Sequence, residues 1–232
     1  MAKKQKILLG INLVLASLVF VGNYFYLTEG GLTLKAACSS GFALMGLINL
    51  IYALAIKAEN LKFNVSMATG LVFACLGDIV LGFDFIIGAA LFAIGHICYF
   101  ISYCMLQRIV RRDFLIGGIL FVLAGGFVLF CPLLEFPEQI MQIVCLVYAL
   151  IISMMLGKAI SNFYATKTIL TTVILVGSVL FFFSDLMLVF DWFMGMGKIA
   201  GRLCMGTYYP AECLLGLSAC LHVLCGSRRN KK

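Results

Sequence analysis

The sequence predicts an all-α polytopic membrane protein with eight transmembrane helices. Of its 232 residues, 63% are hydrophobic and only 12% are charged, and the mean hydropathy is +1.11. This balance is typical of a chain that lies largely within a bilayer. Long apolar runs and a one-sided distribution of lysine and arginine support the same fold class. We therefore expect a single integral membrane domain over residues 1–232.

Each predicted span is an apolar run close to the roughly 20 residues that a helix needs to cross the hydrocarbon core. Such runs are too long for strands, and a helix satisfies its own backbone hydrogen bonds in lipid. The first run follows three lysines as a signal peptide would, but it is too long and no small-residue cleavage site follows, so we expect it to be retained. In chain order, the predicted spans are 7–27, 36–56, 65–83, 85–106, 114–134, 140–157, 169–190 and 199–225.

The charges of the connecting segments support this count and set the orientation. Basic residues follow the second, fourth and sixth spans, including Lys158 after the sixth. With the N-terminus inside, all of the 17 lysines and arginines except Lys35, Lys198 and Arg202 are cytoplasmic, as the positive-inside rule requires. Both termini are thus predicted to be cytoplasmic. The net charge of +7 then reflects topology and contact with anionic lipids, and no nucleic-acid partner is expected.

One motif occurs twice, as GDIVLGFD starting at Gly77 and as SDLMLVFD starting at Ser184. Each copy places an acid, Asp78 or Asp185, inside an apolar span. An unpaired carboxylate there is costly and is a functional candidate by default. The acids that end the two copies, Asp84 and Asp191, lie where the spans end and are expected to be solvated loop residues.

The two copies also suggest an internal repeat. They occupy the third and seventh spans, which both run from inside to outside, so two parallel four-helix repeats over 1–107 and 108–232 would bring Asp78 and Asp185 to similar depths. The alternative is that a short match filled by Leu, Val, Ile and Phe arose by chance in apolar sequence.

Two further groups of polar residues lie within the spans. His96 and Tyr99 share one face of the fourth span, and Tyr208 and Tyr209 precede Glu212 by about one turn in the eighth. If these faces converge, they line a polar cavity that reaches from the outer interface to the middle of the bilayer. Alternatively, His96 only forms a hydrogen bond between helices.

The three outer cations depart from the charge rule. Lys35 opens the second span, and Lys198 and Arg202 flank a glycine-rich turn. At the mouth of an acid-lined cavity they could bind a lipid phosphate, Lys as a point charge and Arg as a fork. Otherwise they extend to the lipid headgroups.

Neither a metal nor another cofactor is expected. The ten cysteines include no CxxC pair, and two histidines, His96 and His222, do not suffice for a three-histidine zinc site. His222 is expected at the cytoplasmic interface. No phosphate-binding loop, dinucleotide fingerprint or serine-hydrolase elbow is present. With these sites excluded, the sequence favours chemistry carried out by carboxyl groups within the membrane.

These residues resemble the YhhN-like lysoplasmalogenases over most of the chain. The resemblance rests on Lys35, the LGD that ends at Asp78, the GHICYF with His96 and Tyr99, the FFFSD that ends at Asp185, and TYYPAECLLGLS from Thr207. The chain departs from the family at Glu212, where glutamine or histidine is expected, and at Ala36, where many relatives have proline.

The resemblance implies hydrolysis of the vinyl ether of a lysoplasmalogen to a fatty aldehyde and glycerophosphoethanolamine or glycerophosphocholine. Such a bond is cleaved by protonating its β-carbon, after which water captures an oxocarbenium ion, so one carboxyl must hold a proton and another must be ionised. We assign these catalytic roles to Asp78 and Asp185. Supporting or substrate-binding roles fall to Lys35, His96, Tyr99, Ser184, Tyr208, Tyr209 and Glu212.

Two other functions remain open from the sequence. Membrane acids, a histidine and parallel repeats also suit a proton-coupled transporter of small molecules or lipids, and a lipid-binding scaffold with structural acids is a third reading. The expected partners are a lysophospholipid substrate and membrane lipids. The expected location is the cell membrane of a bacterium or an internal membrane, such as the endoplasmic reticulum, of a eukaryote.

Overall fold

The computed structural model describes residues 3–58 and 60–229, and all structural statements concern this part of the chain. It contains eight α-helices and no strand among the described residues, and each helix is long and apolar enough to cross a membrane. The predicted fold class is therefore confirmed. The helices are α1 (Lys3–Glu29), α2 (Leu32–Ala55), α3 (Leu61–Leu81), α4 (Phe85–Leu106), α5 (Arg111–Phe130), α6 (Gln139–Thr166), α7 (Ile169–Phe193) and α8 (Gly197–Arg229).

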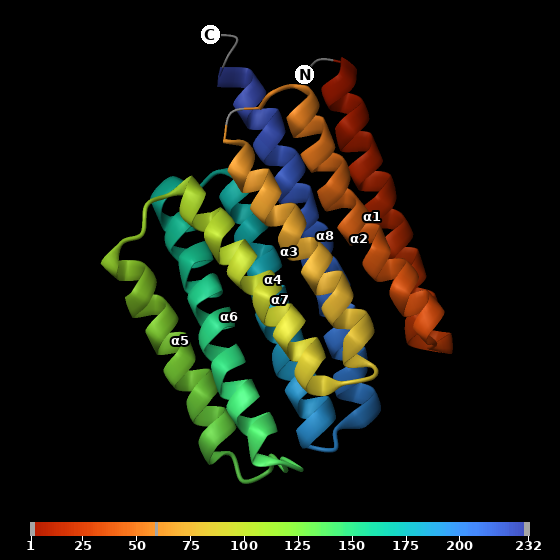
Figure 1. Ribbon diagram of the computed structural model, residues 1–232, viewed down its shortest axis with the longest axis vertical. Coiled ribbons are helices and arrows are strands. Elements are labelled where there is room, and N and C mark those ends of the chain that lie inside the picture. Colours follow the sequence, from red (N-terminus) through yellow and green to blue (C-terminus); the bar gives the residue numbers. More distant parts are fainter. Residues whose placement is uncertain (1–2, 59, 230–232) are drawn as a thin grey trace.

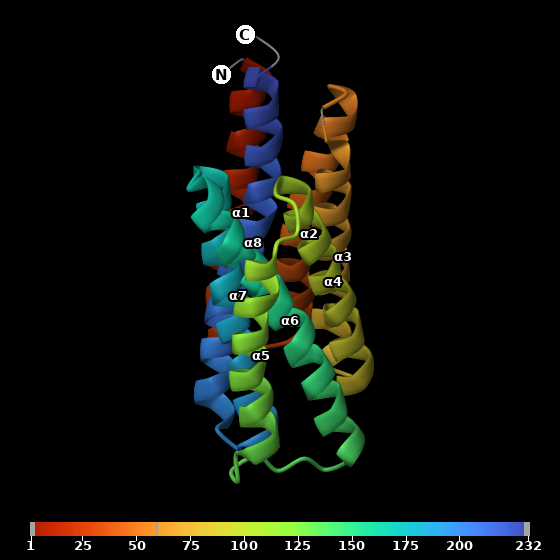
Figure 2. The same ribbon diagram turned by 90° about the vertical axis from the view of Figure 1, so that its left-hand side faces the viewer.

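The helices form one up-and-down bundle (Figure 1), and among the described helices α8 packs on the largest number of others. α8 packs on α1, α2, α3 and α7, whereas α6 packs on α4, α5 and α7. Among the described helices, the backbone of α5 comes close to that of α6 alone. In the view turned by 90°, α1, α7 and α8 lie on one side, α2, α3 and α4 on the other, and α5 and α6 in front (Figure 2).

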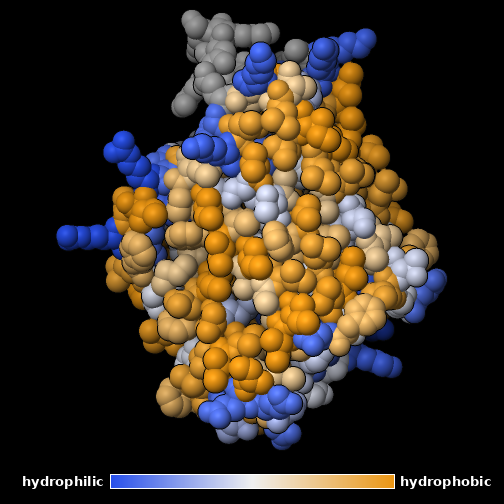
Figure 3. All heavy atoms as spheres, in the orientation of Figure 1, coloured by the Kyte–Doolittle hydropathy of each residue, from blue (hydrophilic) through white to orange (hydrophobic). Residues whose placement is uncertain are grey.

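The surface has the polarity that a membrane protein requires. On the face shown in Figure 3, apolar side chains cover most of the bundle, and the strongly hydrophilic ones lie at its ends and edges. α1 begins and α8 ends at the same end of the bundle (Figure 1), as an even number of spans demands. That this end is cytoplasmic stays a prediction. Lys231 and Lys232, counted among the cytoplasmic charges, lie outside the described residues.

Several pairings recur between the two halves of the chain. Each half packs its consecutive helices together, and the contact of α2 with α8 has a counterpart between α6 and α4. Leu32 and Gln139, the first residues of α2 and α6, are 107 positions apart in the sequence, as are Asp78 and Asp185. The contact between α1 and α8, however, has no counterpart among the described helices. The repeat stays a prediction that these features support.

The sixth helix corrects the sequence prediction at one charged residue. α6 continues to Thr166, so Lys158 is no loop residue but a fully buried one. Its Nζ lies 2.8 Å from Asp113 Oδ2 and donates to the carbonyl of Arg108, also at 2.8 Å. The buried ammonium is tolerated because a carboxylate neutralises it and oxygens accept its hydrogens. Asp113 itself also accepts from Val110 N at the start of α5.

The α3–α4 hairpin positions two of the predicted site residues. Asp84 follows the last residue of the first helix, Leu81, by three positions and caps the second helix, since its Oδ1 accepts from Ile87 N at 2.8 Å. A Cβ on Gly88 would stand 2.6 Å from Leu81 Cα, so only glycine permits the helices to approach this closely. The hairpin thereby holds Asp78 on α3 and His96 on α4 at fixed positions.

Candidate active site

Asp78 lies in a network of one charged and two hydroxyl partners. Its side chain is 1% exposed, and its Oδ1 lies 3.1 Å from Lys35 Nζ. Its Oδ2 accepts from Ser39 Oγ at 2.5 Å and from Tyr209 OH at 3.1 Å. Lys35 and Ser39 lie one turn apart on α2, and Tyr209 comes from α8. A cation and two donors all favour the ionised carboxylate.

Asp185 has fewer partners than Asp78, and no lysine or arginine in the described part of the chain forms an ion pair with it. Tyr148 OH on α6 donates to its Oδ2 at 2.7 Å, and His96 Nε2 lies 3.6 Å from the same oxygen. The Asp185 side chain is 12% exposed. Here the two predicted residues Asp185 and His96 come together, although they lie on different helices.

The hydrogen bonds of His96 indicate where a proton resides. Its Nδ1 lies 2.7 Å from the carbonyl oxygen of Phe92, and because a carbonyl only accepts, we assign the hydrogen to Nδ1. A neutral ring then presents the lone pair of Nε2 to Asp185. Two acceptors facing each other at 3.6 Å repel unless a proton lies on one of them. The pair is therefore suited to hold one proton.

Glu212 forms a third carboxyl site, deeper in the bundle. Tyr99 OH donates to its Oε2 at 2.7 Å, while Oε1 is buried and has no hydrogen-bond partner among the described residues. The rings of Tyr99 and His96 meet edge to face with centroids 6.1 Å apart, which connects this site to that of Asp185. The predicted association of His96, Tyr99 and Glu212 is thus present.

The two aspartates do not share a partner. In the part of the chain that the structure describes, no hydrogen bond or ion pair joins Asp78 to Asp185. Tyr208 packs edge to face against Phe92 and Phe181, and its hydroxyl donates to the Ala74 carbonyl at 3.2 Å. Ser184 donates to the backbone of its own helix, at Phe181 O. Neither Tyr208 nor Ser184 bonds to a carboxylate.

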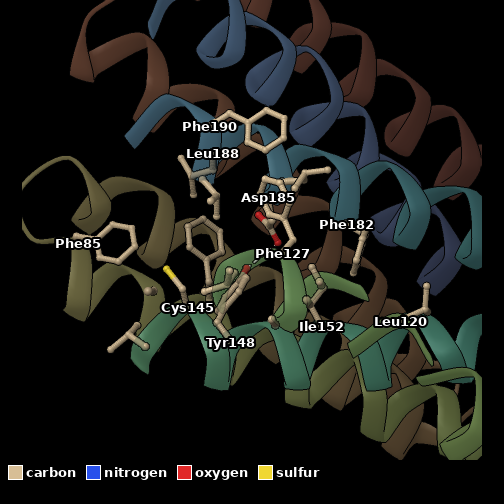
Figure 4. A pocket seen from close by; sticks show the side chains of 18 of the residues that line it. Phe85, Leu120, Phe127, Cys145, Tyr148, Ile152, Phe182, Asp185, Leu188 and Phe190 are labelled. Atoms are coloured by element: carbon tan, nitrogen blue, oxygen red, sulfur yellow. Dashed lines mark hydrogen bonds between the residues drawn. The ribbon is translucent and has the colours of Figure 1, made fainter. Parts of the chain in front are cut away.

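Asp185 lies in the wall of a cavity of about 330 Å³, the apolar cavity, between α4, α5, α6 and α7 (Figure 4). The other lining residues are mostly aliphatic and aromatic, including Leu120, Phe127 and Phe190. Figure 4 shows the carboxyl of Asp185 and the ring of Tyr148 among these side chains. Asp185 is the one acid in the lining among the described residues.

A second cavity, the polar cavity, opens at the end of the bundle opposite the termini. Its volume is about 600 Å³, and it is formed by the ends of α1, α3 and α7 and the beginnings of α2 and α8. Leu81 and Leu188 line both cavities, so they form the partition between them. Each of these leucines follows its aspartate by three residues. The charged residues of the polar cavity are Glu29, Lys35, Asp191, Lys198 and Arg202.

The structure also places Asp191 and His222, and it bears on the question of a metal site. Asp191 is no loop acid, because α7 continues to Phe193 and places it half-buried in the wall of the polar cavity. His222 lies between α3 and α8, where Nδ1 is 2.9 Å from Asn64 Oδ1 and the ring stacks on Phe63. No group of three metal-binding side chains gathers among the described residues.

Two site residues escaped the sequence reasoning. Ser39 follows Lys35 by four positions, so its place on the same helix face was a usable signal. Tyr148 stands alone in an apolar span, and no pattern in the sequence points to it.

Comparison with known proteins gives one match. The model of the YhhN family matches residues 38–219, which includes Asp78, His96, Asp185 and Glu212 and begins just after Lys35. No curated protein and no solved structure matches the chain.

Proposed function

The chain belongs to the YhhN family, and from this premise we propose that it is a membrane-embedded hydrolase that cleaves the vinyl ether bond of lysoplasmalogens. The products are a fatty aldehyde and glycerophosphoethanolamine or glycerophosphocholine. The observation that carries the proposal is a single acid, Asp185, in the wall of an otherwise apolar cavity.

The two cavities suit the two parts of such a lipid. The apolar cavity accepts the alkenyl tail, and the polar cavity, with Lys35 in its wall, accepts the glycerophospho headgroup. The sn-1 ether then lies at the partition formed by Leu81 and Leu188, close to Asp185. This arrangement follows the general form of ligand sites, which combine a largely apolar cavity with a few polar groups.

In the proposed reaction Asp185 is the general acid. Its proton adds to the β-carbon of the vinyl ether, and the double-bond electrons form the new C–H bond and leave an oxocarbenium ion. His96 shares the proton with Asp185, and Tyr148 fixes the orientation of the carboxyl through its hydrogen bond. Among the described residues, no lysine or arginine lies against Asp185 to hold it in the ionised form.

Asp78 supplies the negative charge. Held as a carboxylate by Lys35, Ser39 and Tyr209, it stabilises the cation and accepts a proton from the attacking water. The hemiacetal so formed collapses to the aldehyde and the free glycerol hydroxyl, and one water is consumed per bond cleaved. Asp78 releases the proton that it took from water to solvent, and solvent returns one proton to Asp185, so that both carboxyls regain their starting states. Glu212 and Tyr99 keep His96 in position from below.

The test is the fate of a solvent deuteron. The purified protein is incubated in detergent with an alkenyl lysophospholipid in D₂O, and the aldehyde is trapped at once and analysed by mass spectrometry. We expect one deuterium on the carbon next to the carbonyl, and no cleavage of the saturated alkyl ether of the same length. Activity that requires zinc after treatment with EDTA, or uptake of lipid into liposomes without aldehyde release, would contradict the proposal.

A further inference from the structure

We infer that Asp191, together with Lys198 and Arg202, forms a subsite for a zwitterionic phospho-amine headgroup in the polar cavity. Asp191 receives the ammonium group, and the two cations receive the phosphate. The inference rests on the proposed function for the identity of the tail, but the headgroup contacts do not depend on catalysis.

Of the charged residues that line the polar cavity, Lys35 has an ion-pair partner, whereas the others have none among the described residues. Lys35 is neutralised by Asp78 at 3.1 Å, so it contributes little net charge to an incoming headgroup. In the part of the chain that the structure describes, the side chains of Asp191, Lys198 and Arg202 form no ion pair or hydrogen bond. Two carboxylates, Asp191 and the exposed Glu29, and two cations therefore face the same space of about 600 Å³ without forming an ion pair among the described residues.

Asp191 is the unpaired group with the most restricted position. It is half-buried on α7, and a Cβ on Gly201 of α8 would stand 3.2 Å from its Oδ2, so the carboxylate lies close against the bare backbone of the facing helix. A partly dehydrated carboxylate without a partner is unfavourable. A ligand ammonium group satisfies it, and the neighbouring Arg202 and Lys198 suit a phosphate as a fork and a point charge.

The repeat provides a matched contrast. Asp84 and Asp191 end the two copies of the motif, yet Asp84 is engaged as the N-cap of α4 through Ile87 N. Asp191 is not the N-cap of α8. The repeat pairs Phe85, the first residue of α4, with Trp192, but α8 begins only at Gly197, five residues later. The longer α7–α8 connection thus leaves the acid of the second copy free to face the cavity.

Binding of a non-hydrolysable ligand tests the subsite without reference to turnover. The probes are 1-O-alkyl-glycerophosphoethanolamine and 1-O-alkyl-glycerophosphoglycerol of equal chain length, titrated in detergent by calorimetry against the wild type, Asp191→Asn and the control Asp84→Asn. We expect Asp191→Asn to weaken binding of the amine lipid by about tenfold and to leave the glycerol lipid nearly unchanged. Arg202→Gln should weaken both lipids equally, because both carry the phosphate.

The outcomes separate this inference from the proposed function. Equal loss of both lipids in Asp191→Asn, or no loss of either, would overturn the ammonium subsite even if aldehyde is released normally. Selective loss of the amine lipid would support the subsite even if no aldehyde is ever formed. Binding of free glycerophosphoethanolamine as tight as that of the lipid would show a soluble ligand and overturn the assignment to a lipid.

Discussion

Asp78 and Asp185 occupy equivalent positions of the repeated motif, yet their surroundings differ in kind. Asp78 is enclosed by an ammonium group and two hydroxyls from α2 and α8. Asp185 has one hydroxyl and a histidine nitrogen and lies in the wall of an apolar cavity. The first environment stabilises a charge, and the second leaves a carboxyl able to hold a proton.

The difference originates in the helices that pack beside the motif. The offset that relates the two aspartates pairs Lys35 with Gln142 and Ser39 with Leu146, so α6 lacks the cation and the hydroxyl that α2 provides. Tyr148, further along α6, supplies the only hydroxyl that bonds to Asp185 among the described residues. A repeat can thus place two identical acids symmetrically while neighbouring helices give them opposite roles, as acid–base pairs require.

The largest expected effect is that of Asp185→Asn on turnover. An amide of nearly the same shape cannot donate an acidic proton, so we expect kcat for aldehyde release to fall by about 10²–10⁴-fold. Binding of the saturated alkyl lipid should persist, because the cavity is preserved. Asp84→Asn serves as the control and should keep full activity. Full activity in Asp185→Asn would remove this residue from the chemistry.

The network of Asp78 should respond in stability as well as in activity. Lys35→Met leaves a buried carboxylate without its cation, and we expect a loss of about 3 kcal/mol of unfolding free energy, the lower end for a buried pair because Lys35 is partly exposed. Adding Asp78→Asn to Lys35→Met should restore most of this stability but not the activity. Unfolding in detergent measures the first and aldehyde release the second.

Two outcomes would count against this reading of Asp78. If the double variant is as unstable as Lys35→Met alone, an unpaired buried charge is not the cause of the loss. Lys198→Met, which removes an exposed cation from the same cavity, should leave stability unchanged. A loss of stability in Lys198→Met equal to that in Lys35→Met would also count against the reading.

Tyr148→Phe should have a smaller effect, and it should lower activity more than stability. It removes the hydroxyl that orients Asp185, so we expect kcat to fall about tenfold while the unfolding free energy changes by about 1 kcal/mol. Tyr103→Phe is the matched control, because its buried hydroxyl bonds to Ser178 and not to a carboxylate. Equal loss of activity in both variants would show a general packing effect.

How much of this could be predicted from the sequence depends on the range of the interactions. Composition and run length predict the eight spans, and the repeated motif identifies Asp78 and Asp185, because both signals are local in the chain. Lys158 was misplaced, since ending a span at the first charge ignores a partner such as Asp113 on another helix. The apolar cavity and Tyr148 arise from the packing of four helices, which no local pattern encodes.

The smallest expected effect concerns the wall of the apolar cavity. Phe127 on α5 lines it, and its ring centroid lies 5.5 Å from that of Phe190 on α7. Phe127→Ala enlarges the cavity at a helix whose backbone lies close only to that of α6 among the described helices, so the preference for longer tails in kcat/KM should rise by about fivefold or less. Leu129→Ala, at a half-exposed residue of α5 outside the cavity lining, should leave it unchanged. A shift of the same size in both variants would mean that the tail does not occupy this cavity, and the role of Asp185 as its proton donor would lose its geometric basis.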